Sequence, residues 1–211
     1  IVWQPKELCA LMSPAFIAIK RRLKEVLRDE IVYTDGLTPD MLSARARTIQ
    51  YDYVFEDDLV IQDRQTDQEL IDLEFQVMLD LGLDINLANL WRLVHNKWRF
   101  KGQHSWGQLD AMRLTGQATT ALGNAITNLC VHSSFVIEHR QAIKLMFVLG
   151  DDNITFMSAE PNLTKYKRLM SERYNMRSKP QVSRNVGTFC SLLCYRNSFG
   201  HCEVGPDFVR L

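Results

Sequence analysis

Two apolar runs separated by a short acidic segment constrain this chain more than any other feature. Residues 145–148 and 154–157 are apolar or β-branched, and Leu149-Gly150-Asp151-Asp152-Asn153 lies between them. This pattern predicts two strands joined by a tight turn that carries adjacent carboxylates. Adjacent acids repel each other, and a divalent cation with oxygen ligands is the usual means of offsetting that repulsion. The alternative is an inert surface loop, in which paired acids also occur.

A second acidic segment lies upstream, where another predicted strand ends. Apolar Val54 and Phe55 precede Glu56-Asp57-Asp58, and Asp63 follows five residues after Asp58. Because two Mg²⁺ ions need carboxylates from at least two segments, this spacing indicates that Asp58 could share a metal site with Asp151. A solvated acidic run is the competing interpretation, since residues 56–80 hold nine acids and one base. We expect the later acids to lie on the exposed face of a helix whose apolar side consists of Leu70, Leu73 and Val77.

Between the acidic segments lies a run of small residues, Thr115-Gly116-Gln117-Ala118-Thr119-Thr120-Ala121-Leu122-Gly123-Asn124. It predicts a glycine turn that enters a helix. Thr120 and Asn124 would share one face of that helix, because they are four residues apart. Small side chains permit close approach of a nucleotide, and the Asn124 amide could bond a sugar hydroxyl. A core helix with internally bonded polar groups is the alternative when the segment is considered alone.

In this order, the three segments resemble motifs A, B and C of the RNA-dependent RNA polymerases of positive-strand RNA viruses, and most of all those of the alphavirus-like supergroup. Motif A corresponds to Glu56-Asp57-Asp58 with Asp63, and motif C to Phe147 through Ile154. Residues 174–179 resemble motif D, residues 187–193 motif E, and residues 1–6 the tail of motif F, whose basic core would precede residue 1. The chain departs from the pattern at Gln62, Arg64-Gln65 and Thr115.

The resemblance implies an α+β fold, a right-hand polymerase palm with an antiparallel sheet backed by helices, plus part of the fingers. Residues 1–52 would be fingers, 53–84 palm with motif A, 85–113 a fingers insertion and 114–211 palm with motifs B to E, while the thumb and the amino-terminal fingers would be absent. Periodicity adds a helix over residues 14–28 with buried Phe16, Ile19, Leu23, Val26 and Leu27, helices over 85–97 and 163–173, a hairpin over 98–113 and two strands from residue 186.

The implied activity is transfer of nucleotides from NTPs to an RNA 3′-hydroxyl under the direction of an RNA template, with two Mg²⁺ ions that Mn²⁺ could replace. The expected catalytic residues are Asp58, Asp151, Asp152 and Lys179, with the three acids as metal ligands. The expected nucleotide-binding residues are Asp63, Thr115, Gly116, Thr120, Asn124 and Asn153, and the expected RNA-binding residues are Lys6, Gly116 and Gln117. The alternatives are a reverse transcriptase, which would lack the motif B helix, and a non-catalytic palm-like scaffold that binds RNA.

Composition adds limits rather than a function. The 211 residues are 46% hydrophobic with a formal net charge of zero, and bases gather at residues 20–24 and 165–184. No apolar run approaches the ~18 residues that span a bilayer. We expect the chain to work with other domains of a replicase polyprotein, in the host cytoplasm at membrane-associated complexes. Five cysteines suggest free thiols, and a zinc site stays open at Cys190, Cys194, His201 and Cys202.

Overall fold

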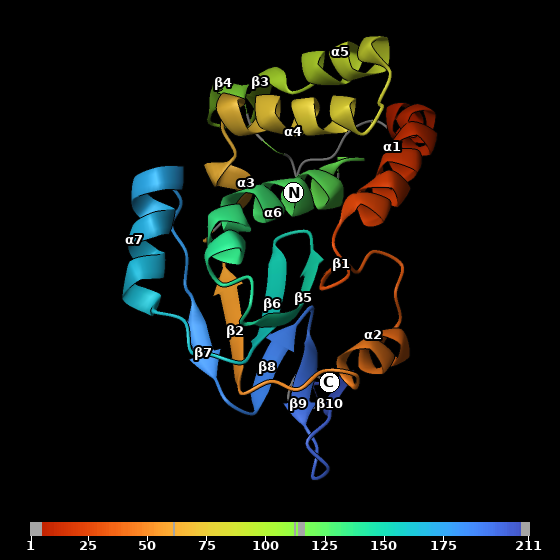
Figure 1. Ribbon diagram of the computed structural model, residues 1–211. Coiled ribbons are helices and arrows are strands. Elements are labelled where there is room, and N and C mark those ends of the chain that lie inside the picture. The colour runs from red at the N-terminus through yellow and green to blue at the C-terminus, as the bar shows by residue number, and fades with distance from the viewer. Residues whose placement is uncertain (1–5, 61, 112, 114–116, 208–211) are drawn as a thin grey trace. The chain divides into compact units, whose positions relative to one another are not determined.

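The structure is a computed structural model that describes residues 6–60, 62–111, 113 and 117–207 (Figure 1). The chain forms two compact units. The first contains residues 1–26 and 61–127, and the second contains residues 27–60 and 128–211. These units break at other places than the predicted divisions at residues 52, 84 and 113. The assignment of segments to palm and fingers therefore stays a prediction.

The first unit is mainly helical. Its elements are α1 (Lys6–Val26), α3 (Gln62–Gln65), α4 (Gln68–Asp80), α5 (Ile85–Leu93), the antiparallel strands β3 (Asn96–Lys101) and β4 (Trp106–Ala111), and the first part of α6 (Thr120–Glu138). The hairpin and the motif B helix were predicted. None of the described helices combines the length and the apolar character that a bilayer crossing requires.

Helix α1 begins eight residues before the predicted start at Pro14, which lies inside the helix. Proline lacks the backbone donor that would bond the Ala10 carbonyl, and the preceding Ser13 hydroxyl donates to the Cys9 carbonyl at 2.5 Å. The predicted stripe is correct for Phe16, Ile19 and Leu23, and it extends back to Met12. It is wrong for Val26, which ends the helix and is 65% exposed.

The buried face of α4 differs from the predicted one. Ile71, Phe75 and Met78 are buried, whereas Leu73 is exposed. The face is rotated because Glu74 is buried too, in an ion pair with the fully buried Arg113. Thr127 donates a further hydrogen bond to the Glu74 carboxylate at 3.0 Å. Burial lowers the pKa of Arg113 to about 10, so this guanidinium stays cationic at neutral pH.

The second unit is built on a five-stranded sheet with the order β1-β5-β6-β2-β7. The strands are β1 (Ile31–Tyr33), β2 (Tyr53–Asp58), β5 (Ile143–Leu149), β6 (Asp152–Met157) and β7 (Gln181–Ser183). Every neighbouring pair is antiparallel except β1 and β5, which are parallel. The predicted α+β class and the motif A and motif C strands are thus confirmed, and the parallel edge strand is an addition.

The two faces of this sheet have different covers (Figure 1). On one face Phe55 of β2 stacks on Phe135 of α6 at 4.7 Å and meets the ring of Tyr166, in helix α7 (Leu163–Tyr174), edge-on at 5.0 Å. On the other face a core cluster includes Val54 and Phe189. That side is covered by α2 (Pro39–Ala46) and by a second sheet of β8 (Val186–Phe189), β9 (Leu192–Arg196) and β10 (Cys202–Pro206).

The pair of Glu74 and Arg113 yields a test of the first unit. Replacing Arg113 with Met leaves a buried carboxylate without its cation, which should lower the free energy of unfolding by about 3–5 kcal/mol. Adding Glu74→Leu to this variant should restore much of the loss. Urea denaturation measures both effects. The exposed pair of Arg21 and Glu25 is the control, and Arg21→Met there should cost less than about 1 kcal/mol; equal losses at the two pairs would contradict the assignment.

Candidate active site

Two acids meet where β2 ends and β6 begins. The antiparallel register places Asp58 directly opposite Asp152. Like charges at opposed positions destabilise a sheet, so a pair of carboxylates here requires a compensating group. Both residues line a pocket of about 370 Å³ together with Glu56, Lys179 and the turn residues Cys190 and Ser191.

The third predicted acid, Asp151, occupies the turn before β6. Gly150 and Asp151 form the two-residue connection between β5 and β6. Gly150 has a φ of +60° and Asp151 does not have a positive φ, which is the pattern of a type II′ turn. The Asn128 amide on α6 donates to the Asp151 carbonyl at 2.9 Å. This bond holds the backbone of the turn, and the Asp151 side chain is exposed.

A buried polar network lies beneath the acid pair, on the helix-covered face of the sheet. Its members are Asp57, Asn128, His132, Asn153 and Tyr166, each at most 3% exposed. The Tyr166 hydroxyl donates to the Asp57 carboxylate at 2.6 Å, and its oxygen lies 2.7 Å from Nε2 of His132. The Asn153 amide donates to the backbone carbonyl of Asp57 at 3.1 Å. The network therefore ties β2 and β6 to α6 and α7.

The protons of this network follow from its geometry. Burial raises the pKa of Tyr166, and the neighbouring Asp57 raises it further, so the phenol keeps its proton and is the donor to Asp57. Nδ1 of His132 lies 2.7 Å from the carbonyl of Asn128, an acceptor only, so Nδ1 carries a proton. Sequence reasoning missed this cluster. The sequence contained one signal of it. Asp57 comes two residues after the buried Phe55 in the same strand, so both side chains lie on the same face of the sheet.

Lys179 enters the pocket from the segment after α7. Its backbone N–H donates to the Asp58 carbonyl at 2.9 Å, and Ser178 forms a bridge with Leu59. The segment that resembles motif D therefore runs beside the segment that resembles motif A. The side chain of Lys179 is exposed and lines the same pocket as Asp58 and Asp152.

The turn between β8 and β9 forms another wall of this pocket. Cys190 and Ser191 have φ values of +51° and +62°, a left-handed conformation that is uncommon for residues with a side chain. Cys190 thus lies in the turn between the two strands. Burial raises the pKa of its thiol, and Asp152 raises it further, so the thiol stays protonated. All five cysteines are free.

Strand β8 comes unusually close to the first sheet. A Cβ at Gly187 would lie 2.6 Å from a methyl group of Val54 and 2.7 Å from one of Ile154. Only glycine lets the backbone of β8 cross the two strands at this distance. The Thr188 hydroxyl then donates to the Glu56 carboxylate at 2.7 Å, beside the acid pair.

The predicted sugar-binding residues lie in the first unit. The Asn124 amide on α6 donates to Asp63 at 3.0 Å, and the Gln62 amide donates to the backbone carbonyl of Asn124 at 3.0 Å. The side-chain oxygen of Asn124 is buried, and no residue that the structure describes forms a hydrogen bond with it. Thr120 is half-buried at the start of the same helix. The structure therefore brings Asp63 and Asn124 together, and their role at a sugar stays a prediction.

The other predicted site residues are placed as follows. Asn153 belongs to the buried network, although it also lines the pocket. Gln117 is buried and bonds His95, and Lys6 is exposed at the start of α1. Thr115 and Gly116 lie outside the described residues. In the part of the chain that the structure describes, no three His, Cys, Asp or Glu side chains form a complete metal-binding cluster, including the cysteines for which zinc was an alternative.

Viral RNA polymerases and viral polyproteins are similar to this sequence. It is 28% identical over its whole length to the RNA-directed RNA polymerase 2a of Pelargonium zonate spot virus, and it spans 30% of that protein. It is 27% identical to the RNA-directed RNA polymerase 2a of alfalfa mosaic virus over 73% of the chain and 20% of the relative. It is 25% identical to the non-structural polyprotein pORF1 of a hepatitis E virus over 72% of the chain and 9% of the relative. The chain thus spans less than a third of these curated relatives.

The fold has a solved counterpart. The structure superimposes on the RNA-dependent RNA polymerase of a human picobirnavirus, an insertion-loop deletion mutant, with a TM-score of 0.67 and 11% identity. The match covers 93% of this chain and 38% of that one, which is consistent with the predicted palm-like fold. The family model described as RNA dependent RNA polymerase matches residues 1–210. With nearly every residue inside that match, the chain belongs to the viral RNA-dependent RNA polymerases, and its curated relatives come from alphavirus-like positive-strand RNA viruses.

Proposed function

We propose that this chain carries the catalytic centre for RNA-templated RNA synthesis by nucleotidyl transfer. The observation that carries the proposal is the cross-strand pair of Asp58 and Asp152, with Asp151 in the adjoining turn and Lys179 on the same pocket. Acids at the tip of an antiparallel hairpin and one cation beside them suit a reaction that moves a polyphosphate, in which the protein mainly supplies position and charge.

The donor set fits Mg²⁺. This ion prefers oxygen ligands, and at polymerase sites it is held by one or two carboxylates together with substrate phosphates, not by a complete protein cage. Asp58 and Asp151 would be the direct ligands and Asp152 a secondary one. When bound, two such ions would lower the pKa of the attacking hydroxyl and neutralise charge on the phosphates. Without a cation, the opposed carboxylates of Asp58 and Asp152 would repel each other across the sheet, which supports a cation beside this pair.

Lys179 would act on the leaving pyrophosphate. Its backbone is bonded to Asp58 and its side chain lines the pocket, so it can reach a triphosphate held by the acids. Two roles are open to it: an ammonium that neutralises charge, or a donor that gives a proton to the departing oxygen. Arginine can replace the first role but scarcely the second, because a guanidinium hardly releases its proton.

Asp63 and Asn124 would recognise the ribose. The bond from the Asn124 amide to Asp63 fixes the orientation of the side chain, which leaves its buried oxygen as an acceptor for a 2′-hydroxyl. A buried acceptor that stays unpaired disfavours the deoxy substrate. This arrangement favours a polymerase that uses ribonucleotides over a reverse transcriptase. Lys6 and Gln117 stay as proposed RNA contacts, and Thr120 and Asn153 as proposed nucleotide contacts.

The metal assignment predicts the effect of Asp151→Ala. Loss of one ligand from a site for a hard cation should reduce nucleotide incorporation by at least ~10²-fold, because the reacting oxygens are no longer aligned. Circular dichroism should show an intact fold, since the side chain is exposed. Incorporation of labelled NTP by the full-length polymerase is the measurement. Glu160→Gln, at another exposed acid, should leave the rate unchanged, and near-normal turnover by Asp151→Ala would refute the assignment.

The sugar assignment predicts a change in selectivity. Asn124→Ala should reduce the preference for rNTP over dNTP by roughly 10-fold or more, mainly through slower rNTP incorporation, because the acceptor for the 2′-hydroxyl is lost. Single-nucleotide kcat/KM values for the two substrates measure this. Asn86→Ala, at an exposed position on α5, is the matched control. An equal loss for both substrates would contradict the assignment of ribose recognition to Asn124.

The two roles of Lys179 predict different results for one substitution. If it donates a proton, Lys179→Arg should slow pre-steady-state incorporation by about 10²-fold or more, nearly as much as Lys179→Met. Lys167→Met, at an exposed lysine of α7, should have little effect. A Lys179→Arg variant with the wild-type rate beside an inactive Lys179→Met would leave only the electrostatic role.

A further inference from the structure

The hairpin of β3 and β4 presents an indole to solvent. Trp106, at the first position of β4, is 86% exposed, more than any other large apolar side chain in the described part of the chain. Such exposure is unfavourable, because the large apolar surface of the indole stays in contact with water and contributes no free energy of burial. The hairpin also borders a recess of about 730 Å³, the size of a small-molecule site.

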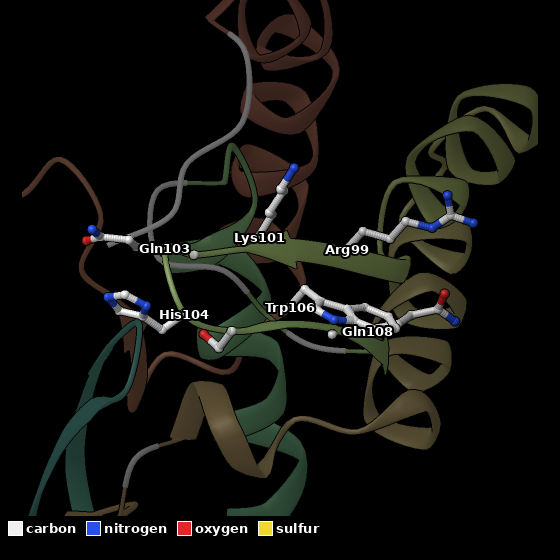
Figure 2. A pocket seen from close by; sticks show the side chains of 9 residues that line it. Arg99, Lys101, Gln103, His104, Trp106 and Gln108 are labelled. Carbon is white, nitrogen blue, oxygen red and sulfur yellow. The ribbon is translucent and has the colours of Figure 1, made fainter.

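The strand register gathers polar side chains on the same face as this indole. Lys101 is directly opposite Trp106, and Arg99 is directly opposite Gln108. Residues two apart share a face of a strand, so these four side chains form one cluster. Arg99 is the diagonal neighbour of Trp106, within reach of a long side chain. Figure 2 shows these side chains projecting from the two strands, with Gln103 and His104 at the tip.

Bases outnumber acids in this region, although β4 also contains Asp110. Residues 85–109 hold four bases and no acid, whereas residues 56–84 hold ten acids. Arg92 pairs with Asp72, but Arg99 and Lys101 make no ion pair with any residue that the structure describes. Both cations are exposed. The face therefore offers two positive charges, both on β3, beside an exposed aromatic ring on β4.

We propose that the face formed by Arg99, Lys101, Trp106 and Gln108 binds single-stranded RNA, with one base stacked on Trp106 and the backbone phosphates on the two cations. An aromatic platform flanked by bases is the chemistry by which proteins hold unpaired strands, since every base has a π-face and every nucleotide a phosphate. A purely apolar partner would leave both cations unpaired and desolvated.

An unpaired strand fits better than a duplex. The faces of bases inside a duplex are covered by their neighbours, so a ring can stack only on a base that is free of its pair. Trp106 projects from a strand that has one neighbour, β3, and its ring is accessible. Taking RNA as the ligand rests on the proposed function, but the site is separate from the residues proposed for chemistry.

Binding can be measured apart from synthesis. We would titrate the 211-residue chain into a fluorescein-labelled single-stranded RNA of about 12 nucleotides and follow anisotropy in EDTA without NTPs, so that no catalysis contributes. Trp106→Ala should weaken binding roughly 5- to 150-fold, and Trp106→Phe should retain most of the affinity. Phe199→Ala removes another exposed aromatic ring, 83% exposed in the second unit, and should have no effect.

The cations are tested by salt dependence. Arg99→Gln and Lys101→Gln should each reduce the slope of log affinity against log salt by about 0.7, the value for one phosphate contact on a single strand, whereas Trp106→Ala should leave that slope unchanged. Unaltered affinity of Trp106→Ala, equal weakening by Phe199→Ala, or equal affinity of the wild-type chain for duplex RNA would each overturn the proposal. Because the assay contains neither NTPs nor free divalent cations, its outcome does not depend on the catalytic assignment, and the two proposals can fail separately.

Discussion

The buried carboxylate of Asp57 is the constraint on which the second unit depends. A charge removed from water is costly unless it is bonded, and here Tyr166 donates to it while His132 lies 3.3 Å away. Those partners come from α7 and α6, so both helices have to pack on β2 in one position. Asn153 adds β6 to the same cluster by bonding the Asp57 backbone. The network thus fixes the register in which Asp58 and Asp152 oppose each other.

The alternation of side chains along β2 places a supporting acid and a proposed catalytic acid on opposite faces of the sheet. Asp57 points into the helix-covered face and Asp58 into the pocket, although the two are neighbours in sequence. Helix α6 makes a similar division along its length, because Asn124 bonds Asp63 in the first unit and Asn128 holds the Gly150 turn in the second. The first part of α6 therefore carries a proposed substrate contact, and its second part supports the acidic turn. Sites held by bonded supporting side chains keep the geometry that catalysis needs.

Sequence reasoning succeeded where the determinants are local. The hairpin around Gly150 follows from two apolar runs and a glycine that can adopt positive φ, and the motif D segment beside motif A follows from the family pattern. It failed where the burial or the role of a side chain depends on a residue far away in the sequence. From the sequence, Glu74 is expected to face solvent. In the structure Arg113, 39 residues later, neutralises it, and the buried face of α4 is rotated to include it. The role of Asp57 depends on Tyr166, 109 residues away, which no periodicity reveals.

The formal net charge of zero conceals an uneven distribution of charge along the chain. Acids gather from residue 56 to residue 84, and the next 25 residues contain none. A site for divalent cations needs concentrated carboxylates, but the same field repels the phosphates of a nucleic acid. Separate basic surfaces resolve this conflict, because phosphates then bind to cations that are not neutralised by the catalytic acids. Arg99 and Lys101, which form no ion pair among the described residues, would be such a surface.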